Sequence, residues 1–283
     1  FCLMYMYHVR FVTALVIRGV AMFVTRLLSG IVLVALLLLT IIPGGYILFF
    51  PLLCISVIGM FELYRAMEIH KGSVSLLEGA GYFCAVVYYG AVWLDFEKYG
   101  MAALLAGLII LMFVYVFTYP KYKADQVMAA FFGLAYVPVM LSFIYLTRNL
   151  EGGIFHVWLI FLCSWGCDTC AYCVGVLIGK HKMTPVLSPK KSVEGAVGGV
   201  VGAVLLGLIY AAATKGDLPA YGIICGVGAL ISMVGDLAAS AIKRNQEIKD
   251  YGTLIPGHGG ILDRFDSVIF TAPIIYFLST LLM

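Results

Sequence analysis

The chain has 283 residues, of which 63% are hydrophobic and 12% charged, and its mean hydropathy is +1.04. A soluble domain has about 25% charged residues and less than about half apolar residues, so this composition excludes a soluble globular protein. The formal net charge of +3 is too small to indicate a nucleic-acid-binding protein. The eight cysteines fall mostly inside apolar stretches, where we expect them to pack as small side chains without forming disulfides.

Residues 1–21 differ from the rest of the chain. They carry Arg10 and Arg18 on a moderately apolar background and lack the small-residue cleavage site of a signal peptide. Met22 then precedes Phe-Val-Thr-Arg and a long apolar run. We therefore expect residues 1–21 to be an upstream extension that adds nothing to the fold, and residues 22–283 to form a single membrane-embedded domain.

The remaining apolar stretches have the length of membrane spans, since about 20 residues cross a hydrocarbon core roughly 30 Å thick. They lack the alternation of a β-barrel, so we predict an all-α, polytopic membrane protein. Nine helices are expected, at residues 27–43, 45–66, 74–93, 101–119, 127–147, 154–178, 194–213, 219–239 and 267–283. The turn at Pro43-Gly44-Gly45 is the weakest boundary, and a single kinked helix there would give eight.

Basic residues are distributed unevenly between the two ends of these helices. With the N-terminus in the cytoplasm, 15 of the 18 Lys and Arg residues fall on the cytoplasmic side, and only Lys98, Arg148 and Lys215 fall on the other. This bias predicts a cytoplasmic N-terminus, an external C-terminus and an active site that faces the cytoplasm from the cell (inner) membrane.

Two acidic residues interrupt apolar stretches: Asp168 within residues 154–178, and Asp236 near the end of residues 219–239. A carboxylate at membrane depth costs about 3 kcal/mol, so such residues usually face a water-filled cavity, a partner or an ion. For Asp168, a structural role in which Thr169 or a basic residue satisfies the carboxylate stays open.

The densest group of charges runs from Asp236 to Asp266. Helical spacing places four polar residues on one face at the cytoplasmic end of a helix: Asp236, Ser240, Lys243 and Arg244. An ordinary cytoplasmic loop, in which acidic residues only balance the basic ones, explains the lysines and arginines. It does not explain why several carboxylates gather here in a protein that is otherwise poor in charge.

A second pair of carboxylates, Asp263 and Asp266, has i, i+3 spacing where the last helix begins, so the two side chains can converge. Gly257, Gly259 and Gly260 just before them permit a tight backbone that exposes N–H groups to an anion. Carboxylate oxygens beside Lys and Arg are what a magnesium nucleotide requires.

The stretch from Ser240 to Asp266 resembles the signature of phosphatidate cytidylyltransferases, also called CDP-diacylglycerol synthases. The matching residues are Ser240, Lys243, Arg244, Lys249, Asp250, Gly252, Ile255, Pro256, His258, Gly259, Gly260, Asp263, Arg264 and Asp266. Three further segments are similar to that family in the same order: Glu62-Leu-Tyr-Arg65, Asp168-Thr-Cys-Ala-Tyr172 and Ser188-Pro-Lys-Lys-Ser-Val-Glu-Gly195. The resemblance covers about residues 22–283.

The resemblance implies that CMP is transferred from CTP to phosphatidic acid, with release of pyrophosphate. It also implies a homodimer and a Mg²⁺ cofactor, with or without a second, monovalent cation. The expected catalytic residues are Asp236, Lys243, Arg244, Asp263 and Asp266, and the three aspartates among them are the expected metal ligands. The expected substrate-binding residues are Asp168, Ser188, Lys190, Ser192, Glu194, Ser240, Lys249, His258, Gly259, Gly260 and Arg264. For His258, a bond to a phosphate oxygen and a bond within the loop both stay open.

Two other functions remain as alternatives. A CTP-dependent lipid-alcohol kinase of the dolichol or phytol type also uses CTP in a membrane, but it would release CDP and would benefit from a general base for its hydroxyl acceptor. A cation transporter would carry acidic residues along a path through several helices, whereas here they gather at the predicted cytoplasmic ends. The complete signature favours the cytidylyltransferase.

Overall fold

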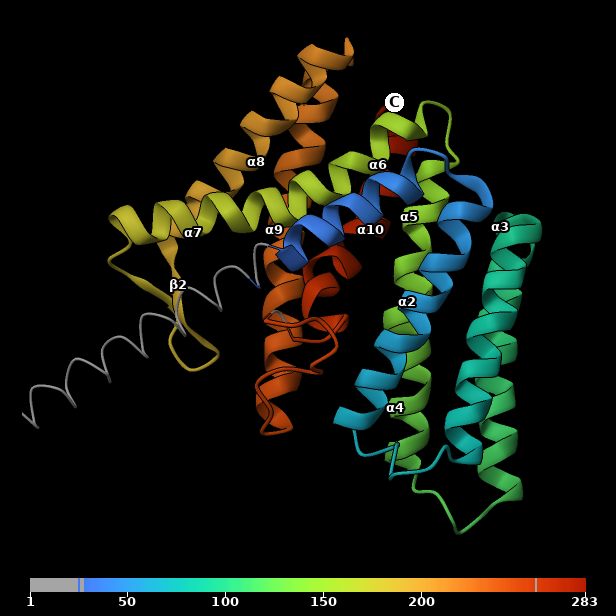
Figure 1. The fold of residues 1–283 in the computed structure, drawn as a ribbon. Helices are drawn as coiled ribbons and strands as arrows, with labels where there is room; N and C mark the ends of the chain where they lie inside the picture. Colours follow the sequence, from blue (N-terminus) through green and yellow to red (C-terminus); the bar gives the residue numbers. More distant parts are fainter. Residues whose placement is uncertain (1–24, 26–27, 258) are drawn as a thin grey trace, which may run out of the picture.

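The computed structural model describes residue 25 and residues 28–257 and 259–283. Within these residues, seven helices are long and apolar enough to cross a membrane (Figure 1). The all-α, polytopic architecture is thereby confirmed, whereas the count of nine helices is not. The proposed extension at residues 1–21 lies outside the described residues, as do Arg10, Arg18 and Arg26.

Within the described residues, four membrane-length helices precede a small β-hairpin and three follow it. Before the first labelled element lies a short apolar helix, Leu28–Ile41. In order, the elements are α2 (Gly45–Ala66), α3 (Leu76–Phe117), α4 (Ala124–Leu134), the π-helical turn η1 (Ala135–Val139), α5 (Met140–Arg148), α6 (Gly153–Phe161), the π-helical turn η2 (Leu162–Gly166), α7 (Cys167–Ile178), β1 (Lys182–Thr184), β2 (Ser188–Ser192), α8 (Val193–Thr214), α9 (Leu218–Asn245) and α10 (Leu262–Leu282).

The 42 residues of α3 form two arms that fold back on each other. Asp95 has extended backbone angles, φ −173° and ψ 103°, in the middle of the element. The thiol of Cys84 lies 3.9 Å from the carbonyl oxygen of Gly107, although a straight helix would place these residues about 35 Å apart. The two arms correspond to the helices predicted at residues 74–93 and 101–119. The sequence therefore predicted both arms, although α3 is assigned as one continuous element.

The first two predicted helices are also separate. Gly44 has a positive φ of 66°, which ends the helix Leu28–Ile41 and excludes a single kinked helix at this point. The Arg148 side chain at the end of α5 donates hydrogen bonds to the carbonyl oxygens of Ile41 (2.8 Å) and Ile42 (3.0 Å). One guanidinium thus satisfies the exposed carbonyl groups at the end of the short helix.

The helix boundaries next to the signature differ from the prediction. Helix α9 runs on to Asn245 and α10 begins at Leu262, so both extend further into the charged segment than the windows 219–239 and 267–283. A hydropathy window stops where charges begin, but the backbone hydrogen bonds of a helix do not. The predicted helical placement of Lys243 and Asp263 is therefore confirmed.

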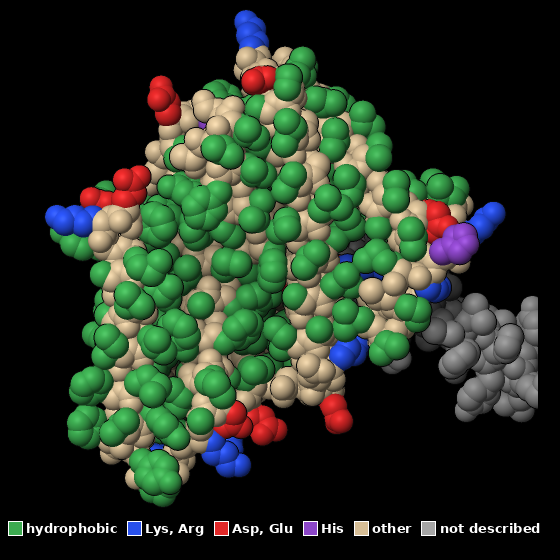
Figure 2. All heavy atoms as spheres, turned by 180° about the vertical axis from the view of Figure 1, so that it is seen from behind, with side chains coloured by type: hydrophobic (Ala, Val, Ile, Leu, Met, Phe, Trp, Pro, Cys, Tyr) green, Lys and Arg blue, Asp and Glu red, His purple; other side chains and the backbone are tan. Residues whose placement is uncertain are grey.

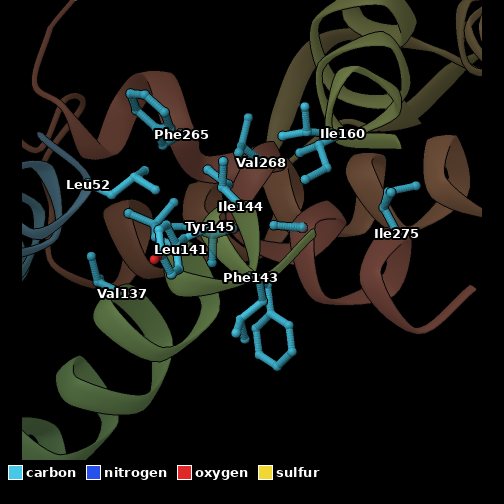
Figure 3. Close-up of a cluster of buried hydrophobic side chains, with 14 of the residues drawn as sticks. Leu52, Val137, Leu141, Phe143, Ile144, Tyr145, Ile160, Phe265, Val268 and Ile275 are labelled. Carbon is cyan, nitrogen blue, oxygen red and sulfur yellow. The ribbon is translucent and has the colours of Figure 1, made fainter. Parts of the chain in front are cut away.

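Buried apolar side chains from α2, α3, α5, α6, α8, α9 and α10 form the main core. Figure 3 shows Leu52 of α2, Ile144 of α5, Ile160 of α6 and Val268 of α10 among them. The outer surface is apolar as well: in Figure 2, hydrophobic side chains cover most of the visible face, and charged side chains lie at its edges. This arrangement fits a protein surrounded by lipid, with its polar groups at the two ends of the bundle.

The glycine stripe of α8 packs inside the protein. An added Cβ at Gly198 would collide with Val174 of α7, and one at Gly202 would collide with Cys170. The opposite face of α8 carries an exposed apolar row that includes Val197. The close approach of α8 and α7 shows that these glycines serve internal helix packing.

The loops before α3, before α4 and before α10 lie at one end of the bundle, at the bottom of Figure 1, whereas the turn between α8 and α9 and the C-terminus lie at the other. The antiparallel pair β1 and β2, in which Lys182 is paired with Ser192, projects to one side below α7. The orientation of these ends relative to the cytoplasm stays a prediction.

Candidate active site

A cavity of about 700 Å³ lies where α7, β2, α9 and α10 meet, a size typical of small-molecule sites. One part of its wall is charged: Asp168, Lys182, Lys190, Lys191, Asp236, Lys243, Asp250, Asp263, Arg264 and Asp266. Another part is apolar or aromatic: Trp165, Ala171, Tyr172, Val176 and Met233. The cavity therefore offers opposite charges and an apolar surface within one space.

The π-helical turn η2 precedes the segment of α7 that reaches this cavity. A π-turn accommodates an extra residue and so shifts which side chains face inward, which is why such turns are common at functional sites. Directly around it, Trp165 donates from Nε1 to the carbonyl oxygen of Arg264 (3.2 Å), and Asp168 lines the cavity. The indole thus ties η2 to the first turn of α10.

Three half-buried carboxylates from different helices share the cavity: Asp168 of α7, Asp236 of α9 and Asp266 of α10. Asp236 accepts a hydrogen bond from Ser240 (3.4 Å). Asp266 accepts one from the backbone N–H of Ser267 (2.9 Å). The three groups act on one another electrostatically, so a cation between them would be stabilised.

The oxygen donors of these residues suit a hard divalent cation, but their positions do not form a complete coordination site. Carboxylate oxygens are the ligands that Mg²⁺ prefers, and Asp236 and Asp266 use few of their lone pairs on protein donors. Across the described part of the chain, no group of three His, Cys, Asp or Glu side chains has the arrangement of a preformed metal site. Side-chain adjustment is therefore needed before an ion is held.

Asp263 differs from the other carboxylates because four protein donors, three of them backbone N–H groups, already occupy its two oxygens. Oδ1 accepts a hydrogen bond from Lys243 Nζ (2.9 Å). Oδ2 accepts backbone N–H groups of Tyr251 (2.8 Å), Gly252 (3.4 Å) and Gly260 (2.9 Å). Only 2% of the Asp263 side chain is exposed, so this carboxylate fixes the loop between α9 and α10.

Lys243 is held between that carboxylate and an aromatic ring. Its Nζ lies 5.3 Å from the centre of the Tyr251 ring, and the Tyr251 hydroxyl donates to the carbonyl oxygen of Ala239 (3.1 Å). Burial, together with nearby carboxylates, raises the pKa of Tyr251 above its usual range, so its hydroxyl stays neutral at physiological pH. Lys243 therefore keeps a fixed ammonium group at the cavity wall.

The β-hairpin contributes a lysine that sequence reasoning did not assign. Lys191 Nζ pairs with Asp236 Oδ2 at 2.5 Å, and both side chains are about three-quarters buried. Neighbouring Lys190, which was expected to bind substrate, lines the cavity but is exposed. The burial of Ser188–Ser192 does not alternate from one residue to the next, so no local signal in the sequence distinguishes the two lysines.

The Arg264 guanidinium is positioned to bind an anion. Its Nε is buried and has no hydrogen-bond partner among the described residues. A buried donor without a partner is costly, so a phosphate oxygen at this point would satisfy it. The hydrogen bond from Trp165 holds the Arg264 backbone at this point.

Comparison with known proteins identifies the family. The model of the cytidylyltransferase family matches residues 24–282. The chain is 32% identical to the phosphatidate cytidylyltransferase of Bacillus subtilis strain 168 over 266 residues, which cover 90% of this chain and 97% of that protein. It is 31% identical to the protein of the same name from Staphylococcus saprophyticus over 254 residues, with 88% and 96% covered. The chain belongs to the cytidylyltransferase family.

In this cytidylyltransferase, the structure gathers part of the predicted site. The predicted residues that line the cavity are Asp168, Lys190, Ser192, Asp236, Lys243, Asp263, Arg264 and Asp266. Ser192 also caps α8, because its hydroxyl accepts the Gly195 N–H (3.1 Å). The wall contains no Ser188, Glu194, Ser240, Arg244, Lys249, Gly259 or Gly260 within the described residues. His258 lies outside the described residues.

The predicted residues outside the cavity wall have other contacts. Arg244 is exposed and donates from Nη1 to the carbonyl oxygen of Ile248 (3.1 Å). Glu194 closes the base of the β-hairpin by accepting hydrogen bonds from the backbone N–H of Lys180 (3.1 Å) and from His181 Nδ1 (2.5 Å). Gly259 has a φ of 92°, which a glycine adopts without strain, and shapes the loop before α10.

Proposed function

We propose that the protein transfers CMP from CTP to the phosphate of phosphatidic acid, leaving CDP-diacylglycerol in the membrane. A phosphate oxygen of the lipid attacks the α-phosphorus of CTP, the bond from that phosphorus to the bridging oxygen breaks, and pyrophosphate leaves. The observation that carries this proposal is the cavity itself, in which carboxylates, phosphate-binding cations and an apolar wall meet. The names of the similar bacterial proteins agree with it.

Mg²⁺ is the proposed cofactor, and Asp236 and Asp266 would hold it with Asp168 beside them. When bound, the ion would neutralise charge on the triphosphate and on the departing pyrophosphate. Asp263 was expected to be a third ligand. We instead infer that it positions Lys243 and the loop, because Lys243 and three backbone N–H groups already donate to its oxygens. A second, monovalent cation remains an expectation from the family resemblance.

The cations would hold the phosphates. Lys243 is held in place by Asp263, and the Arg264 Nε, which has no partner among the described residues, supports a charge-assisted bond to a phosphate oxygen. Lys191 would leave Asp236 for the triphosphate when substrate binds, which would free that carboxylate for the ion. The reaction needs no strong general base, since a phosphate is already ionised at neutral pH; orientation and charge neutralisation are sufficient.

The apolar wall would admit the lipid. Tyr172 and Val176 of α7 line the cavity and are also 73% and 67% exposed, on a surface that otherwise meets lipid. Phosphatidic acid could therefore bring its headgroup to the cations while its acyl chains stay in the bilayer. We propose that this end of the protein faces the cytoplasm, where CTP is available, in agreement with the bias of the basic residues. The homodimer also remains a proposal from the family resemblance.

Purified protein in detergent tests this function directly. With Mg²⁺, CTP and phosphatidic acid, we expect pyrophosphate and CDP-diacylglycerol in equal amounts, and neither product from Asp266→Asn. Asp217→Asn, at the opposite end of the bundle, is the matched control and should retain activity. Phosphorylation of an added lipid alcohol with release of CDP, and no liponucleotide, would instead establish the kinase.

A further inference from the structure

We propose that Glu62 and Arg65, one helical turn apart on α2, are positioning residues for this reaction. They hold the loop before α10 and the first turn of α10, although neither side chain lines the cavity. The proposal rests on the proposed function for its kinetic readout only, because the contacts that support it are independent of any substrate.

Glu62 caps the helix that carries the signature aspartates. Its Oε1 accepts the N–H of Ile261 (3.0 Å), and its Oε2 accepts the N–H of Leu262 (2.8 Å). Helix α10 has no side-chain cap of its own, because Ile261 stands at the capping position. A carboxylate at this end satisfies unpaired N–H groups and interacts favourably with the helix dipole. Glu62 thus supplies, from 200 residues away in the chain, the cap that α10 lacks.

Two glycines of the signature make room for this carboxylate. A Cβ at Gly252 or at Gly260 would collide with the carboxylate of Glu62. The side chain is only 3% exposed and lies against both backbone segments. The loop is therefore shaped around Glu62, which explains in physical terms why small residues stand at these two positions.

Arg65 reaches the same loop at its other end. Its Nη2 donates to the carbonyl oxygen of Tyr251, and its guanidinium lies 5.7 Å from the centre of the Phe61 ring. The N–H of Tyr251 in turn donates to Asp263 (2.8 Å), which pairs with Lys243. One continuous set of contacts therefore runs from α2 to the ammonium group in the cavity.

A purely structural role would lower stability without affecting turnover, so the test needs a control of the same chemistry. Glu78 provides it: this glutamate is fully buried and forms a capping box with Ser75 at the start of α3. Its side chain accepts hydrogen bonds from His70 (3.0 Å) and Tyr82 (2.6 Å), away from the cavity wall. Glu62→Gln and Glu78→Gln each replace a buried capping carboxylate by an amide.

Two readouts separate the roles. The first readout is kcat and KM for CTP, measured together with the midpoint temperature of thermal unfolding. The second is the emission of Trp165, whose indole donates to the carbonyl oxygen of Arg264, recorded with Trp93→Phe and Trp158→Phe in the background. We expect Glu62→Gln to lower kcat about tenfold or more and to shift Trp165 emission, because the first turn of α10 moves. Glu78→Gln should lower the thermal midpoint only.

Conservative variants cover the case in which Glu62→Gln does not fold. Arg65→Lys keeps a donor and should retain more kcat than Arg65→Ala at a comparable thermal midpoint. A Glu62→Gln protein with lower stability but unchanged kcat and Trp165 emission would overturn the proposal, as would equal effects from Glu78→Gln. If the wild-type protein makes no liponucleotide, the proposed function fails, and the Trp165 comparison still decides the positioning role.

Discussion

The replacement Asp263→Asn tests whether Asp263 organises the site or binds a cation. An amide has one acceptor oxygen, which could face the N–H groups of Tyr251 and Gly260. Its NH₂ would then face Lys243, and two donors would stand where an ion pair stood. The variant would therefore leave a buried ammonium group without its carboxylate.

The size of this effect follows from the burial of the pair. The Lys243 and Asp263 side chains are 11% and 2% exposed, so solvent cannot replace the lost partner. Removing one member of a buried ion pair costs about 3 kcal/mol or more, which lowers the thermal midpoint by roughly 6 °C in a chain of this size. Asp266→Asn should change the midpoint by no more than about 1 °C, because its oxygen still accepts the Ser267 N–H and repulsion from Asp236 is relieved.

Thermal unfolding and Mn²⁺ binding, followed by electron paramagnetic resonance, are the assays. We expect Asp263→Asn to unfold at a lower temperature than the wild type but to bind Mn²⁺ with an affinity within about threefold of wild type. Asp266→Asn should instead weaken the affinity for Mn²⁺ about tenfold or more. An Asp263→Asn protein with normal stability and no Mn²⁺ binding would refute this reasoning and restore Asp263 as a ligand.

Two further substitutions probe the surroundings of the cavity. Lys191→Ala removes a competing cation, so the free protein should bind Mn²⁺ about three- to fivefold more tightly, whereas Lys190→Ala should not; equal affinities by titration would contradict the ion-pair argument. Gly260→Ala should lower both activity and the thermal midpoint, because overpacking against Glu62 costs about 1–3 kcal/mol. Gly90→Ala, whose added Cβ would meet nothing within 4 Å, is the control, and an equal loss there would show that the collision is not the cause.

The sequence predicted the features that are local in the chain. Hydropathy identified the helices, and the extended residue Asp95 separates two arms that the windows 74–93 and 101–119 had anticipated. Helical spacing placed Asp236 and Lys243 on one helix and Asp263 at the start of another. These inferences hold because periodicity and length are properties of single segments.

Contacts between distant segments were not predictable in the same way. Nothing local indicates that Glu62 caps a helix 200 residues later, or that Lys243 and the loop occupy the oxygens of Asp263. The choice of Lys191 over Lys190 depends on the contact of Lys191 with Asp236, which lies 45 residues further along the chain. A motif thus showed which residues matter, whereas only the packed structure distinguished groups that face the cavity from groups that support them.

The central claim is that CMP, and not a terminal phosphate, is transferred to the lipid. The most direct measurement uses purified protein, Mg²⁺ and phosphatidic acid with CTP labelled with ³²P at either the α- or the γ-phosphorus. The account predicts that the α-label enters the lipid and the γ-label appears in pyrophosphate, and that Asp266→Asn abolishes both. Entry of the γ-label into a lipid product, with the α-label left in CDP, would contradict the account.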